Sequence, residues 1–206
     1  MQPDRRTHLA AVGSQTIELP VVSLAEDLAI ALLISVDHGI AFTEQAGAEL
    51  ADQLAPHQVD IVVSVATMGI PLAIEVSRSL GLDDYLILHK TPKIHLGDTL
   101  AEPLTSITTE ARQHLRMDPA RIGAVSGCRV ALVDDVISTG ASIQAALRLL
   151  RRAGAEPVVI GSLVTEGTDW VSLLGADAQL VRALGTIPIF RPQPDGTLAT
   201  EWDRVP

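Results

Sequence analysis

Short, continuous apolar runs alternate along this chain with segments that have the periodicity of amphipathic helices. Strands are predicted at residues 60–65, 85–88, 129–133 and 158–164, and helices at about 43–54, 71–81 and 141–153. Uninterrupted apolar strands are typical of a parallel sheet that is covered on both faces. The alternation therefore predicts an α/β fold, in which a twisted parallel sheet is flanked by helices.

The N-terminal part of the chain has a different pattern. Residues 1–20 are polar and end at Pro20, which is typical of an arm or a short strand. Ser23 and Glu26 have the spacing of a helix capping box, and an apolar run continues from there to Val36. We therefore predict a helix over residues 23–36.

The composition restricts the classes of protein to which the chain can belong. Its 206 residues suit one domain with at most a small accessory piece, and 47% of them are hydrophobic, enough for a substantial core. The formal net charge of −10 argues against a surface for nucleic acid or for an anionic membrane. No apolar run is long enough to cross a bilayer, and residues 1–20 lack the pattern of a signal peptide, so a cytoplasmic protein is expected.

The basic residues are unevenly divided between arginine and lysine. Of the 15 basic residues, 13 are arginine, and the two lysines, Lys90 and Lys93, lie three positions apart in one segment that contains proline and glycine. The pair is either chance in an arginine-rich sequence or a sign that this loop binds phosphate with compact ammonium groups. Taken alone, the composition leaves both interpretations open.

The strongest motif spans residues 130–142, with the sequence VALVDDVISTGAS. Asp134 and Asp135 stand where a buried strand ends, which is the edge at which open α/β sheets bind ligands. The Ser-Thr-Gly-Ala-Ser turn that follows opens a helix, and its small residues and hydroxyl groups suit a phosphate. Carboxylates repel a phosphate but suit hydroxyl groups, or a divalent cation reached through water. The segment therefore predicts a ligand with a phosphate beside a polyol, such as a 5-phosphorylated ribose.

Residues 130–142 resemble the phosphoribosyl-pyrophosphate (PRPP) signature of the type I phosphoribosyltransferases. Residues 65–71 follow the first core strand, where that family places its pyrophosphate-binding loop. His89 and Lys90 end the next strand, where the family usually has Arg-Lys, and the long segment after them corresponds to the family's mobile catalytic flap. The resemblance covers roughly residues 35–170.

This resemblance implies the type I phosphoribosyltransferase fold, with residues 1–206 as a single domain. The core would lie at about residues 35–170, and the segments 1–34 and 171–206 would form a small hood. A flexible flap would occupy about residues 91–127. The resemblance also implies a homodimer.

The family transfers the 5-phosphoribosyl group of PRPP to a nitrogen of a nucleobase and releases pyrophosphate, with Mg²⁺ as cofactor. By resemblance, Asp134 and Asp135 orient the ribose, and a magnesium ion bound mainly through PRPP reaches one of them through water. A catalytic role is also implied for Lys93 on the flap, which with Lys90 would neutralise the pyrophosphate. The other residues that the resemblance places on PRPP are Ala66, Thr67, Met68 and Gly69 at the pyrophosphate, and Ser138, Thr139, Gly140, Ala141 and Ser142 at the 5-phosphate.

Details of the motifs separate the branches of the family. Ser138 stands where hypoxanthine-guanine enzymes typically carry an aspartate, a proposed general base. About forty residues separate His95 from Asp134, more than orotate enzymes usually have and closer to xanthine enzymes and the effector domains of purine-operon repressors. Adenine enzymes share the phosphate motif. Ala66 departs from the glutamate of several purine enzymes, and His89 departs from the usual arginine.

The resulting hypothesis is a purine phosphoribosyltransferase of nucleotide salvage that acts on xanthine or adenine. One alternative is a module that senses PRPP without turning it over, and another is an orotate phosphoribosyltransferase. The sensor is disfavoured because only some 20 residues precede the first expected helix and because the net charge is negative. Trp170 follows the last strong strand and either stacks on the base or is a buried residue of the hood.

Overall fold

A parallel sheet of five strands forms the centre of the computed structural model, which describes residues 6–91, 100–104 and 113–202. The strand order is β10-β9-β8-β4-β5, and every neighbouring pair is parallel. The strands are β4 (Ile61–Val65), β5 (Tyr85–Leu88), β8 (Arg129–Ile137), β9 (Glu156–Glu166) and β10 (Val181–Ile187). The predicted α/β class and the four predicted core strands are confirmed.

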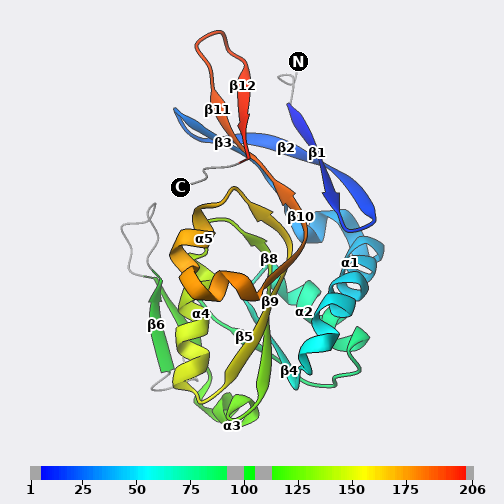
Figure 1. Cartoon of the computed structure of the whole chain (residues 1–206), viewed down its shortest axis with the longest axis vertical. Helices are drawn as coiled ribbons and strands as arrows, with labels where there is room; N and C mark the ends of the chain where they lie inside the picture. Colours follow the sequence, from blue (N-terminus) through cyan, green and yellow to red (C-terminus); the bar gives the residue numbers. More distant parts are fainter. Residues whose placement is uncertain (1–5, 92–99, 105–112, 203–206) are drawn as a thin grey trace.

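Helices cover both faces of this sheet (Figure 1). On one face lie α1 (Gly39–Leu54) and α2 (Gly69–Ser79), and on the other lie α3 (Ile122–Val125) and α4 (Ala141–Arg152). All five residues of β4 are buried, as expected for a strand between two helical layers. Short helical segments complete the chain: η1 (Ser35–His38), η2 (Ala55–His57), η4 (Pro119–Arg121), α5 (Asp169–Leu174) and η5 (Gly175–Leu180).

The two ends of the chain meet in a second, antiparallel sheet, which we call the terminal sheet (Figure 1). Its strands, in spatial order, are β1 (Thr7–Val12), β2 (Gln15–Ala25), β3 (Leu28–Ala31), β11 (Ile189–Pro192) and β12 (Leu198–Glu201). The terminal sheet joins the central sheet at β10, where Gly13 N donates a hydrogen bond to Leu184 O at 2.9 Å. Because β10 pairs with β9, the central sheet extends past residue 170, where the hood was expected to begin.

The predicted helix over residues 23–36 is wrong. Residues 15–25 and 28–31 form the hairpin of β2 and β3, in which Val22 pairs with Ile30. Burial alternates along the second strand, since Ala29 and Ala31 are buried and their neighbours are not, and this is the period of a strand. The capping-box spacing is a local signal, and pairing with β11 and with the rest of the terminal sheet outweighs it.

Part of the segment predicted as a flap is packed structure. Within residues 91–127, β6 (Leu100–Leu104) and β7 (Gln113–Met117) form an antiparallel hairpin. Leu115, Met117 and Val125 are fully buried against α4 and the sheet, so the range from β7 onwards belongs to the core. Residues 92–99 and 105–112, including Lys93, lie outside the described residues.

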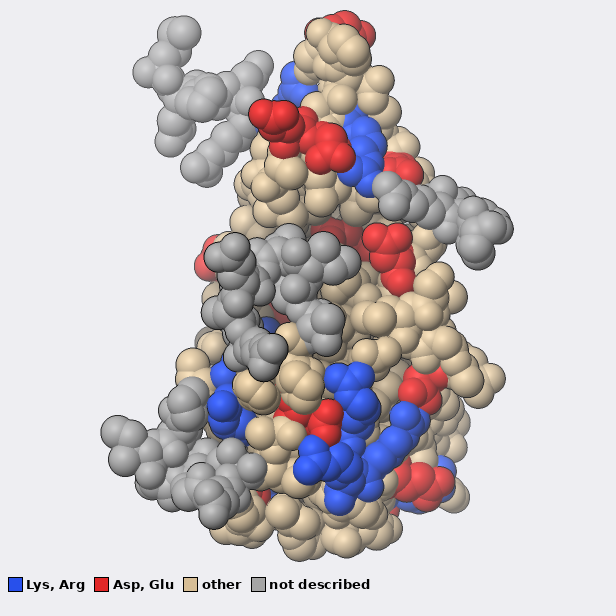
Figure 2. Space-filling model, turned by 90° about the vertical axis from the view of Figure 1, so that its left-hand side faces the viewer, with Lys and Arg blue, Asp and Glu red and all other residues tan. Residues whose placement is uncertain are grey.

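An acidic side chain fastens this hairpin to α4. Glu102 of β6 is buried and accepts hydrogen bonds from Arg148, at 3.2 Å, and from Arg152. Figure 2 shows lysine and arginine side chains gathered, together with acidic ones, on the face that carries β6 and α4. The hydrogen bond from Arg152 lowers the pKa of Glu102, against the opposing effect of its burial. The turn of residues 138–140 leads directly into α4. These ion pairs therefore link the β6–β7 hairpin to the helix that follows this turn.

No helix among the described residues is long and apolar enough to span a membrane.

Glu102→Gln is expected to lower the free energy of unfolding by about 1 to 2 kcal/mol, because two arginines lose their ionic partner. A lowered folded-state pKa stabilises the fold above the unfolded pKa of glutamate, near 4.3, and this stabilisation is lost as the pH falls through the folded value. Urea unfolding at pH 7 and pH 4 measures both effects. Glu156→Gln, which removes an exposed ion pair with Arg129, is the control and should change stability by less than about 0.5 kcal/mol. Equal losses in the two variants would contradict the fastening role.

Candidate functional site

The candidate site lies where the order of the central strands reverses. From β4 the chain continues to β5 on one side, and β8, on the other side of β4, is followed by β9. The connections after β4 and β8 therefore diverge from two adjacent parallel strands. Such a switch point at the carboxyl edge is where open α/β sheets bind ligands. Both loops that the sequence analysis selected, residues 66–69 and 138–142, begin at this point.

Two neighbouring carboxyl groups occupy the centre of this edge. Asp134 is 9% exposed, Asp135 is half-buried, and the N–H of Asp135 donates to Asp134 Oδ1 at 3.1 Å. Burial raises the pKa of Asp134 well above its ordinary range, the negative charge of Asp135 raises it further, and the charge of Lys90 opposes both. Burial also raises the pKa of Asp135. A ligand that brings hydroxyl donors or a cation would relieve this unfavourable arrangement.

The first turn is pressed against the acidic pair by a glycine. A Cβ atom on Gly69 would lie 2.3 Å from Ser64 Oγ and 2.8 Å from Asp134 Oδ1, so no larger residue fits without displacing one of them. The carbonyl of Met68 accepts a hydrogen bond from Ser35 Oγ at 3.0 Å, which holds the turn from behind. The Ala66–Thr67 peptide bond is cis, and Thr67 is exposed. The structure thus brings the predicted pyrophosphate loop next to Asp134.

The second turn forms a hollow at the start of α4. A cavity of about 110 Å³ is lined by Asp134, Val136, Ile137, Ser138, Thr139, Gly140, Ala141, Ser142 and Ile143. Gly140 precedes the helix with φ of +80°, a conformation that favours glycine, and it has no side chain to accept hydrogen bonds from the first helical turn. The N–H groups of that turn can therefore bind an anion. All five residues predicted to hold a phosphate line one cavity.

One cation, Lys90, acts on the acidic pair, and a second, Arg116, binds the backbone of Lys90. Lys90 follows β5 and is exposed, and its charge lowers the pKa of both aspartates. Arg116 of β7 donates from Nη1 to the carbonyl of Lys90 at 3.4 Å, and its backbone pairs with that of His89. The sequence analysis missed Arg116, because its strand was assigned to the flap. His89, which follows β5, is held at the end of the strand by backbone hydrogen bonds with Arg116.

A second hollow opens between this edge and the terminal sheet. It is lined by Ser138, Glu166, Gly167, Thr168, Asp169, Ile189, Glu201 and Trp202. Ser138 Oγ donates a hydrogen bond to Glu166 Oε2 at 2.5 Å. Burial raises the pKa of Glu166, and the bond from Ser138 partly opposes this. From the sequence, residues 166–170 are expected at the edge where the base should sit, but a role is considered only for Trp170 and none for Glu166, although a charged residue directly after the apolar run 158–164 is the same signal that selected Asp134.

Trp170 is a structural residue and does not line this hollow. Its indole Nε1 donates to the carbonyl of Gly167 at 3.1 Å, and its ring packs against the cluster formed by α4. A Cβ atom on Gly140 would lie 3.1 Å from the Cβ of Trp170. Of the two predicted alternatives for Trp170, the structure supports the packing role, since the side chain is half-buried and lies behind the turn of residues 138–142.

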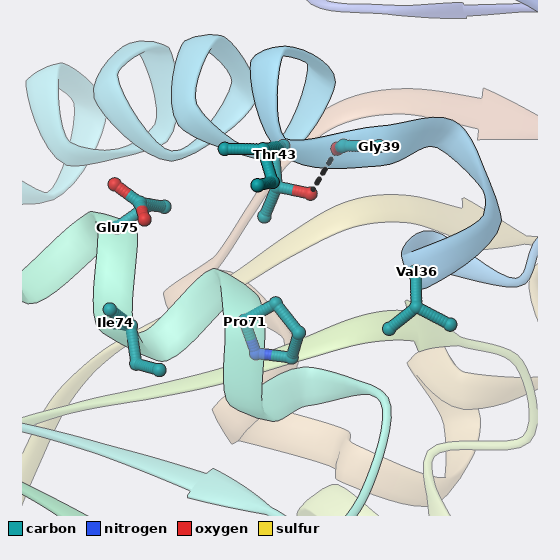
Figure 3. Close-up of a pocket in the computed structure, with 7 residues that line it drawn as sticks. Val36, Gly39, Thr43, Pro71, Ile74 and Glu75 are labelled. Carbon is teal, nitrogen blue, oxygen red and sulfur yellow. Dashed lines mark hydrogen bonds between the residues drawn. The ribbon is translucent and has the colours of Figure 1, made fainter.

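A larger cavity, of about 310 Å³, lies away from this edge between η1, α1 and α2 (Figure 3). Its walls are mainly apolar, with Val36, Pro71 and Ile74 turned toward it and Glu75 at one side. Among the residues that the structure describes, no lysine or arginine lines it, so these walls do not suit a phosphorylated ligand. The two smaller hollows at the carboxyl edge remain the candidate site.

Comparison with known proteins agrees with this geometry. The model of the phosphoribosyl transferase domain family matches residues 41–177, which contain β4, β8, the acidic pair and both turns. The chain belongs to the type I phosphoribosyltransferase family. The expected family membership is therefore confirmed.

The relatives of this chain include enzymes and regulators. It is 32% identical over 109 residues to a hypoxanthine/guanine phosphoribosyltransferase of Methanococcus voltae, a match that covers 53% of this chain and 54% of the relative. It is 30% identical over 124 residues to the purine biosynthesis transcriptional repressor PurR of Bacillus subtilis, covering 60% of this chain and 42% of the relative. The match thus spans about half the length of these relatives.

Solved structures confirm the type I phosphoribosyltransferase fold. An adenine phosphoribosyltransferase from Rhodothermus marinus superposes with a TM-score of 0.58 at 22% identity, covering 87% of this chain and 93% of the other. The enzyme from Giardia lamblia complexed with 9-deazaadenine superposes with a TM-score of 0.60 at 16% identity and the same coverage. At these identities the likeness concerns the fold alone.

The described residues contain no group of three or more histidine, cysteine, aspartate or glutamate side chains placed to hold a metal ion. Asp134 and Asp135 offer oxygen donors, the type that Mg²⁺ prefers, but two neighbouring carboxylates do not complete its six-fold shell. The donor set fits an ion that takes most of its ligands from a bound phosphate compound and from water.

Asp134→Asn is expected to stabilise the free protein at neutral pH by about 1 to 3 kcal/mol, because the amide keeps the shape of the side chain and removes a buried, poorly compensated charge. Since the folded-state pKa of this carboxyl is raised, its charge destabilises the fold above that pKa. The gain in the free energy of unfolding should therefore shrink as the pH falls, because Asp134 of the wild type then becomes protonated in both the folded and the unfolded state. Urea unfolding between pH 8 and pH 5 measures it, with the exposed Asp52→Asn on α1 as control. If Asp134→Asn were less stable than the wild type at pH 8, the charge of Asp134 would not be a source of instability in the free protein.

Proposed function

We propose that the protein is a PRPP-dependent purine phosphoribosyltransferase, which transfers the 5-phosphoribosyl group from PRPP to a nitrogen of xanthine or adenine and releases pyrophosphate. The observation that supports this most strongly is the position of the two aspartates between two anion-binding turns. Gly69 brings one turn against Asp134, and the other turn begins at Ser138. A pyrophosphate, a polyol and a phosphate therefore fit side by side, in the order in which PRPP carries them.

In this reaction the bond between the ribose C1 and the pyrophosphate oxygen breaks while a base nitrogen bonds to C1. Positive charge develops on the ribose ring, and the carboxylates of Asp134 and Asp135 are placed to stabilise it and to accept hydrogen bonds from the ribose hydroxyls. Negative charge develops on the leaving pyrophosphate. Lys90 and the backbone N–H groups of residues 66–69 stabilise that charge.

Asp134 and Asp135 would hold Mg²⁺ through water, while the oxygens of PRPP supply its other ligands. When bound, the ion supplies positive charge that neutralises the pyrophosphate. The 5-phosphate would be held by the turn of residues 138–142 and by the first N–H groups of α4. These contacts orient the ribose so that its C1 faces the second hollow.

We assign the acceptor base to that second hollow, beneath the terminal sheet, which then acts as the hood of the single domain. Its lining includes residues of β9, β11 and β12, so the C-terminal strands of the terminal sheet enclose one side of the base. Lys93 remains part of the proposal as a flap residue that meets the pyrophosphate on closure. Enclosure of the reactants would keep water from hydrolysing PRPP.

A module that binds PRPP without turnover is the second candidate, because the chain is also similar to the repressor PurR. The two functions differ in one observable, the release of pyrophosphate when a base is present. Incubation with PRPP, Mg²⁺ and each of adenine, xanthine, hypoxanthine, guanine and orotate therefore distinguishes them. Tight binding of PRPP without pyrophosphate from any base would establish the sensor instead of the enzyme.

Asp135→Asn is expected to leave the fold intact and to lower kcat/KM for PRPP at least about tenfold, equivalent to roughly 1.4 kcal/mol, because the ribose loses a charged acceptor. The measurement is the rate of pyrophosphate release with the best base, with circular dichroism as the test of folding. Asp52→Asn is the control. Unchanged kinetics in the folded Asp135 variant would remove this residue from the ribose site.

Lys90→Ala should weaken the binding of PRPP measured by calorimetry, because Lys90 stands at the edge of the sheet beside the acidic pair before any closure. Lys93→Ala should lower kcat more than affinity, which is the signature of a contact made near the transition state. Lys90→Arg should restore less than full affinity, since a planar guanidinium does not replace a compact ammonium group. Wild-type constants in all three variants would show that the lysines have no role at the pyrophosphate.

A further inference from the structure

Glu166 is a buried carboxyl group at the carboxyl end of β9. Only 6% of its surface is exposed. Ile137 of β8 pairs with Thr165 of β9, so the next residues along, Ser138 and Glu166, leave the sheet side by side. Ser138 donates the 2.5 Å hydrogen bond described above to Oε2, and among the described residues no lysine, arginine or histidine forms an ion pair with Glu166.

One hydroxyl partner does not satisfy a buried carboxylate. An ionised carboxyl group has two oxygens that together accept about four hydrogen bonds, and a buried one without partners is costly to keep. Among the described residues, Oε1 of Glu166 has no hydrogen-bond partner, and the side chain lines the second hollow. The ionised side chain therefore destabilises the fold of the free protein. It gains further hydrogen-bond partners only from a ligand that donates hydrogen bonds.

Glu166 is the charged group of the hollow that we expect to select the ligand, because the other two carboxyl groups are already paired or exposed to water. Glu201 is paired with Arg191, whose Nε donates to it at 2.9 Å, and Asp169 is exposed to water. The described residues that line it include three carboxyl groups and no lysine or arginine. An acceptor with a negative charge, such as orotate, is repelled by this lining.

We propose, on the basis of the proposed function, that Glu166, held in place by Ser138, is the specificity residue for the acceptor and selects a purine with an amino group at position 6 over one with an oxo group. The amino group donates hydrogen bonds that the carboxylate accepts. An oxo group places its own lone pairs against the carboxylate and leaves it unpaired. A site built around such a hydrogen bond discriminates strongly against the analogue that lacks it.

The planar base also needs a wall on which to stack. The hollow measures about 30 Å³, room for about two water molecules, so the base enters when a lining group moves aside. Trp202 is a lining residue that can do so, since 47% of its surface is exposed. Its ring is in contact with that of His8, with 6.1 Å between the centroids. The ring of Trp202 offers a face for stacking on the base.

The test compares kcat/KM for adenine and hypoxanthine in the wild type, Glu166→Gln and Ser138→Ala. The wild type should prefer adenine by at least about a hundredfold. Glutamine has the same shape and both donates and accepts, so Glu166→Gln should reduce the adenine-to-hypoxanthine ratio at least about tenfold while the Kd for PRPP stays unchanged. Ser138→Ala should reduce the ratio less, because it only frees the carboxylate. Glu156→Gln, at the other end of β9, is the matched control and should keep the wild-type ratio.

The outcomes separate this inference from the proposed function. Pyrophosphate release with a preference for hypoxanthine, or an unchanged ratio in folded Glu166→Gln, would overturn the inference and leave the proposed function standing. PRPP binding without turnover would overturn the proposed function. In that case calorimetric titration of adenine and hypoxanthine into the PRPP-loaded protein decides, since selective binding of adenine that is lost in Glu166→Gln supports the inference and equal binding contradicts it. If Glu166→Gln does not fold, the ratio in Ser138→Ala decides in the same way.

Discussion

The close approach of β4 and β8 at their carboxyl ends is the constraint on which the site depends. The turn after β4 must pass beside Asp134, and only a residue without a Cβ atom fits at Gly69, because a Cβ atom there would lie 2.8 Å from Asp134 Oδ1. This contact places the start of α2 and the acidic pair in one small volume. The turn before α4 then follows on the other side of the same pair. This one close contact therefore sets the spacing between the two turns and the carboxylates that lie between them.

The same region is poorly stabilised in the free protein. Asp134, Asp135 and Glu166 all have pKa values raised by burial, and among the described residues none of them has an ion pair at hydrogen-bond distance. By contrast, Glu102, which has no place in the site, has two arginine partners and a lowered pKa. The chain thus compensates its structural acid internally and leaves the acids of the site to be compensated by ligands.

The sequence predicted the parts of the site that are local. Residues 130–142 form a strand, a turn and a helix in one continuous stretch, so their apolar pattern and small residues were enough to place the acidic pair and the phosphate turn. The helix predicted over residues 23–36 failed because β3 pairs with β2 on one side and with β11, from the other end of the chain, on the other, which no local pattern reveals. Arg116 was missed for a related reason, since its position depends on the pairing of β7 with β6 and with the end of β5.

Glu166 illustrates the same limit at the level of chemistry. Ser138 was interpreted from the sequence as the loss of an aspartate, because the hypoxanthine-guanine pattern has its carboxylate at this position. The parallel register of β8 and β9 brings another carboxylate to within 2.5 Å of the Ser138 hydroxyl, from a residue 28 positions away. A carboxyl group is therefore present at this edge, but it belongs to the neighbouring strand and opens toward the terminal sheet. Moving an acid from one strand to the next keeps the charge of the site and changes the direction from which it meets the acceptor, which is how a shared fold can retain its donor chemistry and change its choice of base.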